Sequence, residues 1–368
     1  MYVALPVKIQ ITPAEAAPLA ATVSAASNAK GFVMAWSMPY RVGANQSITS
    51  FVSNGAVNPA LFTTTCNPTP ASTYFDSGPA KGKSARLATP SIKPSMLLAS
   101  YTSKSGSVVI DPLQTASDAS LMNQYLAGVR ATIALGIAAD DRWYAGTAYY
   151  LNTSDATRSV RSNDMMTAAT SLQPYLNSQY LQQDILGGKA DILIYETGLA
   201  SLDPGENKTN VFLPGAMADT LTSFSGAMYD SNGQISILDF LKAGASASYG
   251  TVREPCNYTQ KFPKSSVLAS HLLAGDSLME AYSKSVEWPT EGLFIGEPLA
   301  RPYSRIRASE VAGEVMLENV GGMNGYYNIT YNDATVATSI YLKQNATSKT
   351  NIGALKFTGN LVIKAILQ

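Results

Sequence analysis

Short apolar segments alternate with helix-forming segments between residues 31 and 295, and this alternation constrains the fold more than any other feature. Each apolar segment is bounded by glycine or proline, which is typical of buried strands. Alternation with helices predicts a mostly parallel sheet with helices on both faces, and so an α/β fold. The predicted strands lie at 31–36, 147–151, 191–195, 211–213, 245–249 and 293–295.

The predicted helices lie in the intervals between these strands. Residues 116–135 have apolar side chains at spacings of three and four, the pattern of an amphipathic helix. A second helix is predicted to start at Ser154 or Asp155, either of which can cap it, and to end near Leu172. Two further helices are predicted at 234–243 and 265–286.

The chain is long enough for more than one structural unit. Its 368 residues exceed the size at which a single hydrophobic core usually stops growing. Residues 1–303 are predicted to form the α/β unit, with a long loop excursion at 43–94, where no periodicity is found. Residues 304–368 alternate in period two between turn signals, which predicts a small β-rich unit.

Charge and hydropathy limit the partners. Lys+Arg and Asp+Glu are both 26, and no basic run is found, so nucleic acid is not a predicted partner. No stretch reaches the roughly 18 apolar residues of a membrane-spanning helix. Only 14% of residues are charged, which suits an exported or self-assembling protein. We therefore expect a secreted or cell-surface location, although no signal peptide is found in this chain.

The two cysteines, Cys66 and Cys256, allow one disulfide or two free thiols. Both lie in irregular, turn-rich segments, and in an exported protein this favours the disulfide. As a nucleophile, Cys256 would need a lowered pKa, and the nearest cations in sequence are Arg253 and Lys261. Formation of the disulfide would end that role.

Motifs for cofactors and metals are incomplete. Residues 78–84 resemble a phosphate loop but have the wrong glycine spacing, and residues 230–233 lack the later ligands of a calcium loop. No cofactor or metal is therefore predicted. The single histidine, His271, is interpreted as a packed or surface residue of a helix, because the nearest carboxylate, Asp276, lies beyond Gly275.

A composite pattern occupies residues 214–303. Its parts are Pro-Gly-Ala at 214–216, Asp-x-Leu-Thr-Ser at 219–223, Gly-Thr-Val-x-Glu-Pro-Cys at 250–256 and Gly-Glu-Pro-Leu-Ala at 296–300. Segments 38–41, 94–99 and 153–158 fit the same pattern. Together they resemble an uncharacterised family of exported bacterial proteins found in genomes with exosortase-type sorting systems. The resemblance covers about residues 30–303.

This family is distantly similar to the gingipain and caspase clan, whose catalytic His follows one parallel strand and whose Cys follows the next. Here the corresponding predicted strand ends, 195–198 and 213–216, carry neither residue. Cys256 also precedes His271, the reverse of that order. The resemblance implies a gingipain-like scaffold without a working Cys/His peptidase site.

Two departures from the family pattern bear on function. Thr220 stands where family members often have histidine. Only about 30 residues precede the first matching strand, so the resemblance implies the loss of a first strand. The exposed sheet edge could then be completed by another copy of the chain.

The candidate site lies beyond the carboxyl ends of the predicted strands, where ligands bind in open α/β sheets. Asp219 and Glu254 could perform acid/base chemistry there if their pKa values were separated, and Cys256 is a third catalytic candidate. A purely structural role for Asp219 as a helix cap, and for Arg41 as the partner of a carboxylate, is the alternative. The candidate ligand-binding residues are Arg41, Glu196, Asp219, Ser223 and Glu254.

Two functions of different class follow from the sequence. One is a non-catalytic exported protein that binds a ligand or assembles with copies of itself. The other is a divergent hydrolase that uses the carboxylates of the strand ends or Cys256.

Overall fold

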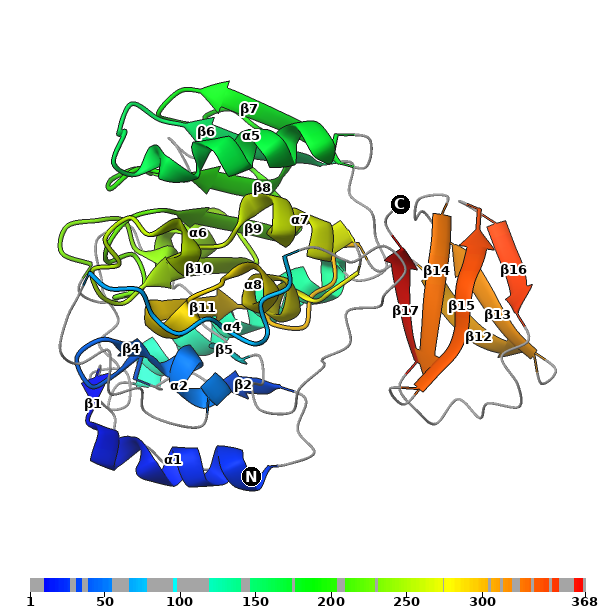
Figure 1. Cartoon of the computed structure of the whole chain (residues 1–368), viewed down its shortest axis with the longest axis horizontal. Helices are drawn as coiled ribbons and strands as arrows, with labels where there is room; N and C mark the ends of the chain where they lie inside the picture. The colour runs from blue at the N-terminus through cyan, green and yellow to red at the C-terminus, as the bar shows by residue number, and fades with distance from the viewer. Residues whose placement is uncertain are drawn as a thin grey trace.

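The computed structural model of the protein is shown in Figure 1. It describes residues 10–26, 31–34, 39–54, 66–77, 95–97, 119–139, 146–173, 176–203, 209–228, 231–273, 275–303, 306–311, 314–319, 325–331, 334–343, 346–350 and 361–366. Residues 78–84, which resemble a phosphate loop in sequence, lie outside these described residues.

An eight-stranded sheet forms the centre of the protein, in the order β2-β5-β11-β10-β9-β8-β6-β7. All neighbouring strands in it are parallel except β10 and β11. The predicted α/β fold with a mostly parallel sheet is therefore confirmed. The strands are β2 (Phe32–Met34), β5 (Ser95–Leu97), β6 (Thr147–Asn152), β7 (Asn177–Gln182), β8 (Ile192–Thr197), β9 (Phe212–Thr220), β10 (Ala247–Thr251) and β11 (Gly292–Gly296).

The antiparallel pair divides the sheet into two blocks. Strands β2, β5 and β11 run one way, and the other five strands run the opposite way. The carboxyl ends of β6, β8, β9 and β10 therefore meet at one edge of the sheet, whereas β2 ends at the opposite edge. The expectation that the strand at 31–36 ends at the same edge as the strands near Glu196 and Asp219 was wrong, because β2 runs the opposite way.

Helices cover both faces of the sheet (Figure 1). Tyr150 and Tyr249 pack on one face against α5, α7 and α8. Tyr149 and Leu293 lie on the other face, which packs against α1, α2 and α6. The helices are α1 (Pro13–Ala25), α2 (Ile48–Asn54), α4 (Ala119–Ala139), α5 (Ser162–Ser171), α6 (Ile237–Ala243), α7 (Ser265–Leu273) and α8 (Leu278–Ser285), with 3₁₀ turns η2 (Ser159–Arg161), η3 (Thr259–Lys261) and η4 (Pro289–Glu291).

Two predicted helices are shorter than expected. The helix predicted from Ser154 starts only at Ser162, because the Asp155 carboxylate accepts a hydrogen bond from the Arg158 amide, 3.1 Å away, and fixes a turn. The helix predicted at 265–286 is two helices, since Gly275 has a φ of +85° and Ser277 caps a new helix start.

Strand β9 is longer than predicted. Its pairing with β8 joins Ile192 to Phe212 and Ile194 to Met217, so extra residues bulge out of β9 in between. Gly215 lies in this bulge with a φ of +84°, and its amide donates to the Ser246 hydroxyl, 2.8 Å away. The Pro-Gly pair therefore does not end the strand, and the end falls at Asp219 and Thr220 instead of at 213–216.

The loop excursion predicted at 43–94 was wrong in its first part. Residues 46–54 form β4 (Gln46–Ser47) and helix α2, whose Ile48 and Phe51 side chains are buried. Strand β4 belongs to a small sheet in the order β1-β3-β4, with β1 (Gln10–Ile11) and β3 (Arg41–Val42). Residues 66–77 run without helix or strand across the protein.

The strands after residue 303 pair only with one another in the described part of the chain. One sheet has the order β12-β13-β16 and the other β15-β14-β17. This confirms the predicted C-terminal β unit, while its boundary at 303 stays a prediction. The strands are β12 (Ile306–Val311), β13 (Glu314–Asn319), β14 (Gly325–Tyr331), β15 (Ala334–Leu342), β16 (Ala346–Thr350) and β17 (Leu361–Ile366).

Among the helices of the described residues, none combines the length and the apolar character that a membrane span requires.

Candidate functional site

A row of polar side chains crosses four strands near their carboxyl ends. The pairing register places Tyr150 of β6 beside Glu196 of β8, Glu196 beside Asp219 of β9, and Asp219 beside Tyr249 of β10. Side chains that are paired across parallel strands point to the same face of a sheet. This face is the one that α5, α7 and α8 cover. The sheet therefore brings two predicted site residues, Glu196 and Asp219, together.

Arg161 lies between these two carboxyl groups. It follows β6 at the end of η2 and is 3% exposed. One guanidinium nitrogen, Nη2, donates to Asp219 Oδ1 at 2.6 Å, and Nη1 lies 3.6 Å from Glu196 Oε2. The guanidinium also donates to the carbonyl oxygens of Thr197 and Pro263, at 3.1 and 3.2 Å. We call Arg161, Glu196 and Asp219 the charge cluster.

Burial shifts the proton affinities of the charge cluster. It raises the pKa of Glu196 to about 8, and the negative charge of Asp219 adds to this, whereas Arg161 and a hydrogen bond from the Ser265 hydroxyl oppose it. Burial also raises the pKa of Asp219, against the opposing effect of Arg161. One cation is thus shared by two carboxyl groups, and Glu196 keeps its proton through neutral pH.

The raised pKa of Glu196 predicts that stability falls as pH rises. The folded protein binds this proton more tightly than the unfolded chain, so the contribution is complete below pH 4.5 and is lost as pH rises through about 8. The unfolding free energy of the wild type, relative to that of Glu196→Gln, should drop by on the order of 3 kcal/mol between pH 5 and pH 8. Urea unfolding at several pH values measures this difference.

Glu291 provides the comparison for that experiment. Burial raises its pKa to about 7, against the opposing charge of Lys261, whose Nζ lies 2.9 Å from Glu291 Oε1. The contribution of Glu291, measured against Glu291→Gln, should therefore be lost as pH rises through about 7, at a lower pH than the contribution of Glu196. A stability difference between wild type and Glu196→Gln that is the same at pH 5 and pH 8 would contradict the assignment.

The charge cluster keeps unused hydrogen-bonding capacity. Among the described residues, Arg161 Nε, Glu196 Oε1 and Asp219 Oδ2 are buried without a hydrogen-bond partner. The hydroxyl groups of Tyr150 and Thr197 are also buried without a hydrogen-bond partner. Most buried polar atoms in proteins are paired, so this concentration marks the place as unusual.

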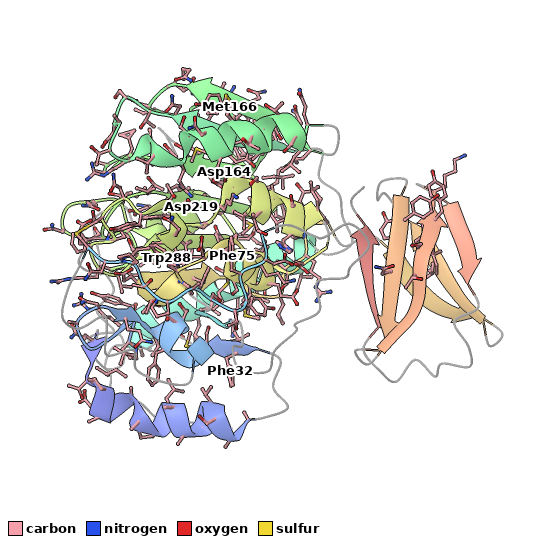
Figure 2. The ribbon with its side chains drawn as sticks, in the orientation of Figure 1. Phe32, Phe75, Asp164, Met166, Asp219 and Trp288 are labelled. Atoms are coloured by element: carbon pink, nitrogen blue, oxygen red, sulfur yellow. A yellow bond between two sulfur atoms is a disulfide. The ribbon has the colours of Figure 1, made fainter. Side chains whose placement is uncertain are left out.

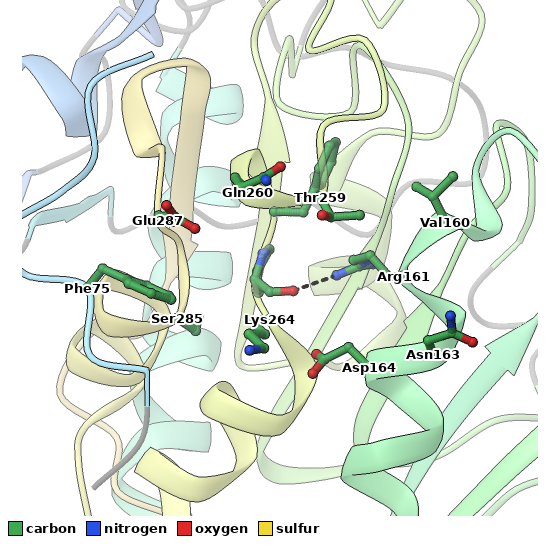
Figure 3. Close-up of a pocket in the computed structure, with 12 residues that line it drawn as sticks. Phe75, Val160, Arg161, Asn163, Asp164, Thr259, Gln260, Lys264, Ser285 and Glu287 are labelled. Atoms are coloured by element: carbon green, nitrogen blue, oxygen red, sulfur yellow. Dashed lines mark hydrogen bonds between the residues drawn. The ribbon is translucent and has the colours of Figure 1, made fainter. Parts of the chain in front are cut away.

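A pocket of about 320 Å³ opens beside the charge cluster (Figure 3). Arg161, Asn163 and Asp164 lie on one side of it, and Phe75 and Glu287 lie on the other. Asp164 belongs to α5 and Asp219 to the central sheet (Figure 2). The remaining lining residues are Val160, Thr259, Gln260, Phe262, Pro263, Lys264 and Ser285.

The other predicted site residues lie at or just beyond the carboxyl end of β10 and, in the part of the chain that the structure describes, do not contact the charge cluster. Arg41 Nη2 donates to the Gln10 side chain at 2.6 Å, and Nη1 donates to the Val252 carbonyl at 3.3 Å. The Ser223 carbonyl accepts from the Thr251 hydroxyl, 3.0 Å away. Within the described residues, no hydrogen bond or ion pair joins Arg41, Ser223 or Glu254 to the charge cluster. The structural alternatives for Asp219 and Arg41 were wrong, since Asp219 lies in strand β9 and Arg41 bonds to the amide side chain of Gln10.

The predicted disulfide between Cys66 and Cys256 is confirmed, with the two Cα atoms 5.3 Å apart. Cys256 therefore has no free thiol, and its prediction as a nucleophile is wrong for this structure. The carboxylate of Glu254 accepts a hydrogen bond from the Cys256 amide, 2.9 Å away. Glu254 and Cys256 thus serve the conformation of this turn.

His271 is buried and belongs to a second ionic group. Its Nδ1 lies 2.8 Å from Asp276 Oδ2, and Lys284 Nζ lies 2.6 Å from the same oxygen. Its Nε2 faces the carbonyl oxygen of Asp76 at 3.2 Å. The turn at Gly275 folds Asp276 back onto the helix that carries His271. This group ties α7 and α8 to the segment 66–77, away from the charge cluster.

Sequence reasoning does not identify Arg161 or the lining residues Asp164, Lys264 and Glu287. One sequence signal could have indicated Arg161: it lies soon after the predicted strand 147–151. The segment between them fits either a helix capped by Ser154 or Asp155 or a turn. The pocket combines four separate segments of the chain, around 75, 160–164, 259–264 and 285–287. Nothing in the sequence shows that they meet.

No protein-family model matches the chain, and no curated protein matches it. The fold and the site define an α/β protein with a buried charge cluster and an adjoining pocket at the carboxyl ends of its parallel strands. The resemblance to an exported family with a gingipain-like scaffold stays a prediction.

Proposed function

We propose that the protein is an exported, non-catalytic protein on a peptidase-like α/β scaffold, and that it binds a small ligand in the pocket beside Arg161. The observation that carries the proposal is the charge cluster. Glu196 and Asp219 occupy the strand ends where a gingipain-type peptidase would need its catalytic residues, and both are held by Arg161.

The environment of these carboxyl groups favours binding over catalysis. A general acid or base must come within hydrogen-bond reach of the substrate. Glu196 is 1% exposed and Asp219 is fully buried, and neither lines the pocket. Arg161 alone of the three borders it. The cluster is therefore suited to holding the strand ends and the pocket wall in one fixed arrangement.

The disulfide and the low charge support an exterior location. Disulfides persist in oxidising compartments and are rare in the cytosol. The bond between Cys66 and Cys256 fixes one end of segment 66–77, which contributes Phe75 to the pocket.

Assembly with other copies through the edge strand β2 is a second part of the proposal. Light scattering at high protein concentration would measure this assembly.

A divergent hydrolase is the alternative, and one observation favours it. Glu196 combines a pKa of about 8 with a hydrogen bond from the Ser265 hydroxyl. A carboxyl group that stays protonated at neutral pH is able to act as a general acid. This version would need an opening that exposes Glu196 to a substrate.

Filling the pocket should abolish ligand binding. Thr259 lines the pocket and is exposed, so Thr259→Trp should occupy its mouth without disturbing the core. In a thermal-shift panel of amino acids, short peptides and sugars, at least one compound should raise the Tm of the wild type by a few degrees. The same compound should leave Thr259→Trp unchanged.

Thr167→Trp is the matched control, since Thr167 is an exposed residue of α5 that does not line the pocket. It should respond to the compound like the wild type. Peptide, ester and glycan substrates should show no turnover above background. Turnover that Glu196→Gln or Asp219→Asn abolishes would replace this proposal with the hydrolase.

A further inference from the structure

The pocket has charged side chains of both signs on its wall. Arg161 and Lys264 are the cations, and Asp164 and Glu287 are the anions. Figure 3 shows Glu287 near Phe75, across the pocket from Arg161, with Lys264 between them. A pocket of this kind is matched to a ligand that itself carries two separated charges.

Two of these four side chains are already engaged. Arg161 donates to Asp219, and the Asp164 carboxylate accepts from the amide and the hydroxyl of Ser266, at 3.2 and 2.6 Å. Within the described residues, the side chains of Lys264 and Glu287 have no ion-pair partner. Lys264 and Glu287 are therefore the charges that a ligand would meet.

Two helix starts add positive potential on the side of Arg161 and Lys264. Helix α5 begins at Ser162 and has no side-chain cap, and α7 begins at Ser265, directly after Lys264. The helix dipole places positive potential at each start, where the Ser162 amide donates to the Ser159 carbonyl oxygen and the Ser266 amide donates to Asp164. The Nε atom of Arg161 is buried on the same side without a hydrogen-bond partner. This side of the pocket therefore favours a carboxylate.

The opposite side favours a cation and an apolar group. Glu287 supplies a carboxylate there, and Phe75 supplies an aromatic face beside it. Phe262 and Pro263 add apolar surface to the wall. The volume of about 320 Å³ is near the lower end of the range of ligand pockets, so the ligand is small.

We infer that the pocket binds a small zwitterion of amino-acid or dipeptide size, with its carboxylate at Lys264 and Arg161 and its ammonium group at Glu287. This inference rests on the proposed ligand-binding function and specifies its ligand class. The side chain of the ligand would lie against Phe75 and Phe262.

Three related probes test the two charges separately. They are L-alanyl-L-alanine, its N-acetyl form, which lacks the ammonium group, and its amide, which lacks the carboxylate. Calorimetric titration of the full chain at low salt should show binding of the dipeptide. Each blocked probe should bind roughly tenfold or more weakly, because a charged hydrogen bond is lost in each case.

Two variants assign each charge to its residue. Lys264→Gln should weaken the dipeptide roughly tenfold and leave the amide unaffected, whereas Glu287→Gln should weaken the dipeptide and leave the N-acetyl form unaffected. Lys343→Gln, an exposed lysine at the end of β15, is the matched control and should bind like the wild type. Circular dichroism confirms that the variants are folded.

The outcomes separate this inference from the proposed function. If none of the three probes binds, or if the blocked probes bind as well as the dipeptide, the zwitterion is excluded. A different ligand whose binding Thr259→Trp abolishes would still support the proposed function. Hydrolysis of the dipeptide by the wild type would overturn the proposed function itself.

Discussion

Arg161→Met will destabilise the protein by about 3–5 kcal/mol, because it leaves two buried carboxyl groups without their cation. Glu196 and Asp219 are 1% and 0% exposed, and Arg161 is the only cation within 4.0 Å of either among the described residues. The variant also loses the hydrogen bonds to the Thr197 and Pro263 carbonyl groups. Urea unfolding at neutral pH measures the loss.

Arg158→Met is the matched control for Arg161→Met. Arg158 pairs with Asp155 at 2.7 Å, but the two side chains are 27% and 25% exposed, so the cost should stay below about 1 kcal/mol. Adding Asp219→Asn to Arg161→Met should recover part of the loss, since it removes one unpaired charge. A cost for Arg161→Met as small as that for Arg158→Met would show that the charge cluster does not hold the strand ends.

The general fold could be predicted because alternation is a local pattern. Strands such as β6 and β8 are buried on both faces and are therefore continuous apolar runs that end at polar residues. The end of β8 was placed correctly, so Glu196 could be predicted as a site residue. The direction of a strand is not local information, and the reversal at β10 and β11 was therefore missed.

The end of β9 was misplaced because Pro214 and Gly215 usually stop a strand. In this fold they lie in a bulge, where the missing amide of proline costs no ladder hydrogen bond and Gly215 takes a positive φ. Asp219 was predicted as a site residue because it lies beyond the carboxyl end of the predicted strand 211–213, and its position at the true end of β9 agrees with that location.

Arg161 was missed for a related reason. A helix that started at Ser154 or Asp155 would place Arg161 in its second turn, where an arginine is usually exposed. The turn at Asp155 delays the helix, so that the short η2 segment directs Arg161 toward the sheet. The turn at Asp155 and the ion pairs with the sheet together determine the position of Arg161. Only the turn can be predicted from the neighbouring residues.

Replacing both cysteines, in Cys66→Ser with Cys256→Ser, will lower the unfolding free energy by roughly 5 kcal/mol. The disulfide joins residues that are 190 positions apart, and closing so long a loop removes entropy of this size from the unfolded chain. The bond also holds segment 66–77, where the Ser72 amide donates to the Glu287 carbonyl at 2.7 Å. Urea unfolding of the variant and of the oxidised wild type measures the difference.

Each single cysteine variant should lose as much stability as the double variant, because either substitution opens the same loop. Wild type unfolded in the presence of dithiothreitol should agree with them. If the double variant unfolds at the same urea concentration as the wild type, the disulfide adds no stability, and the support that it gives to an oxidising location falls. A loss near 5 kcal/mol would be a large part of the roughly 5–15 kcal/mol that stabilises an ordinary domain. Such a chain would keep its full stability only where the disulfide stays intact, as it does in oxidising compartments outside the cytosol.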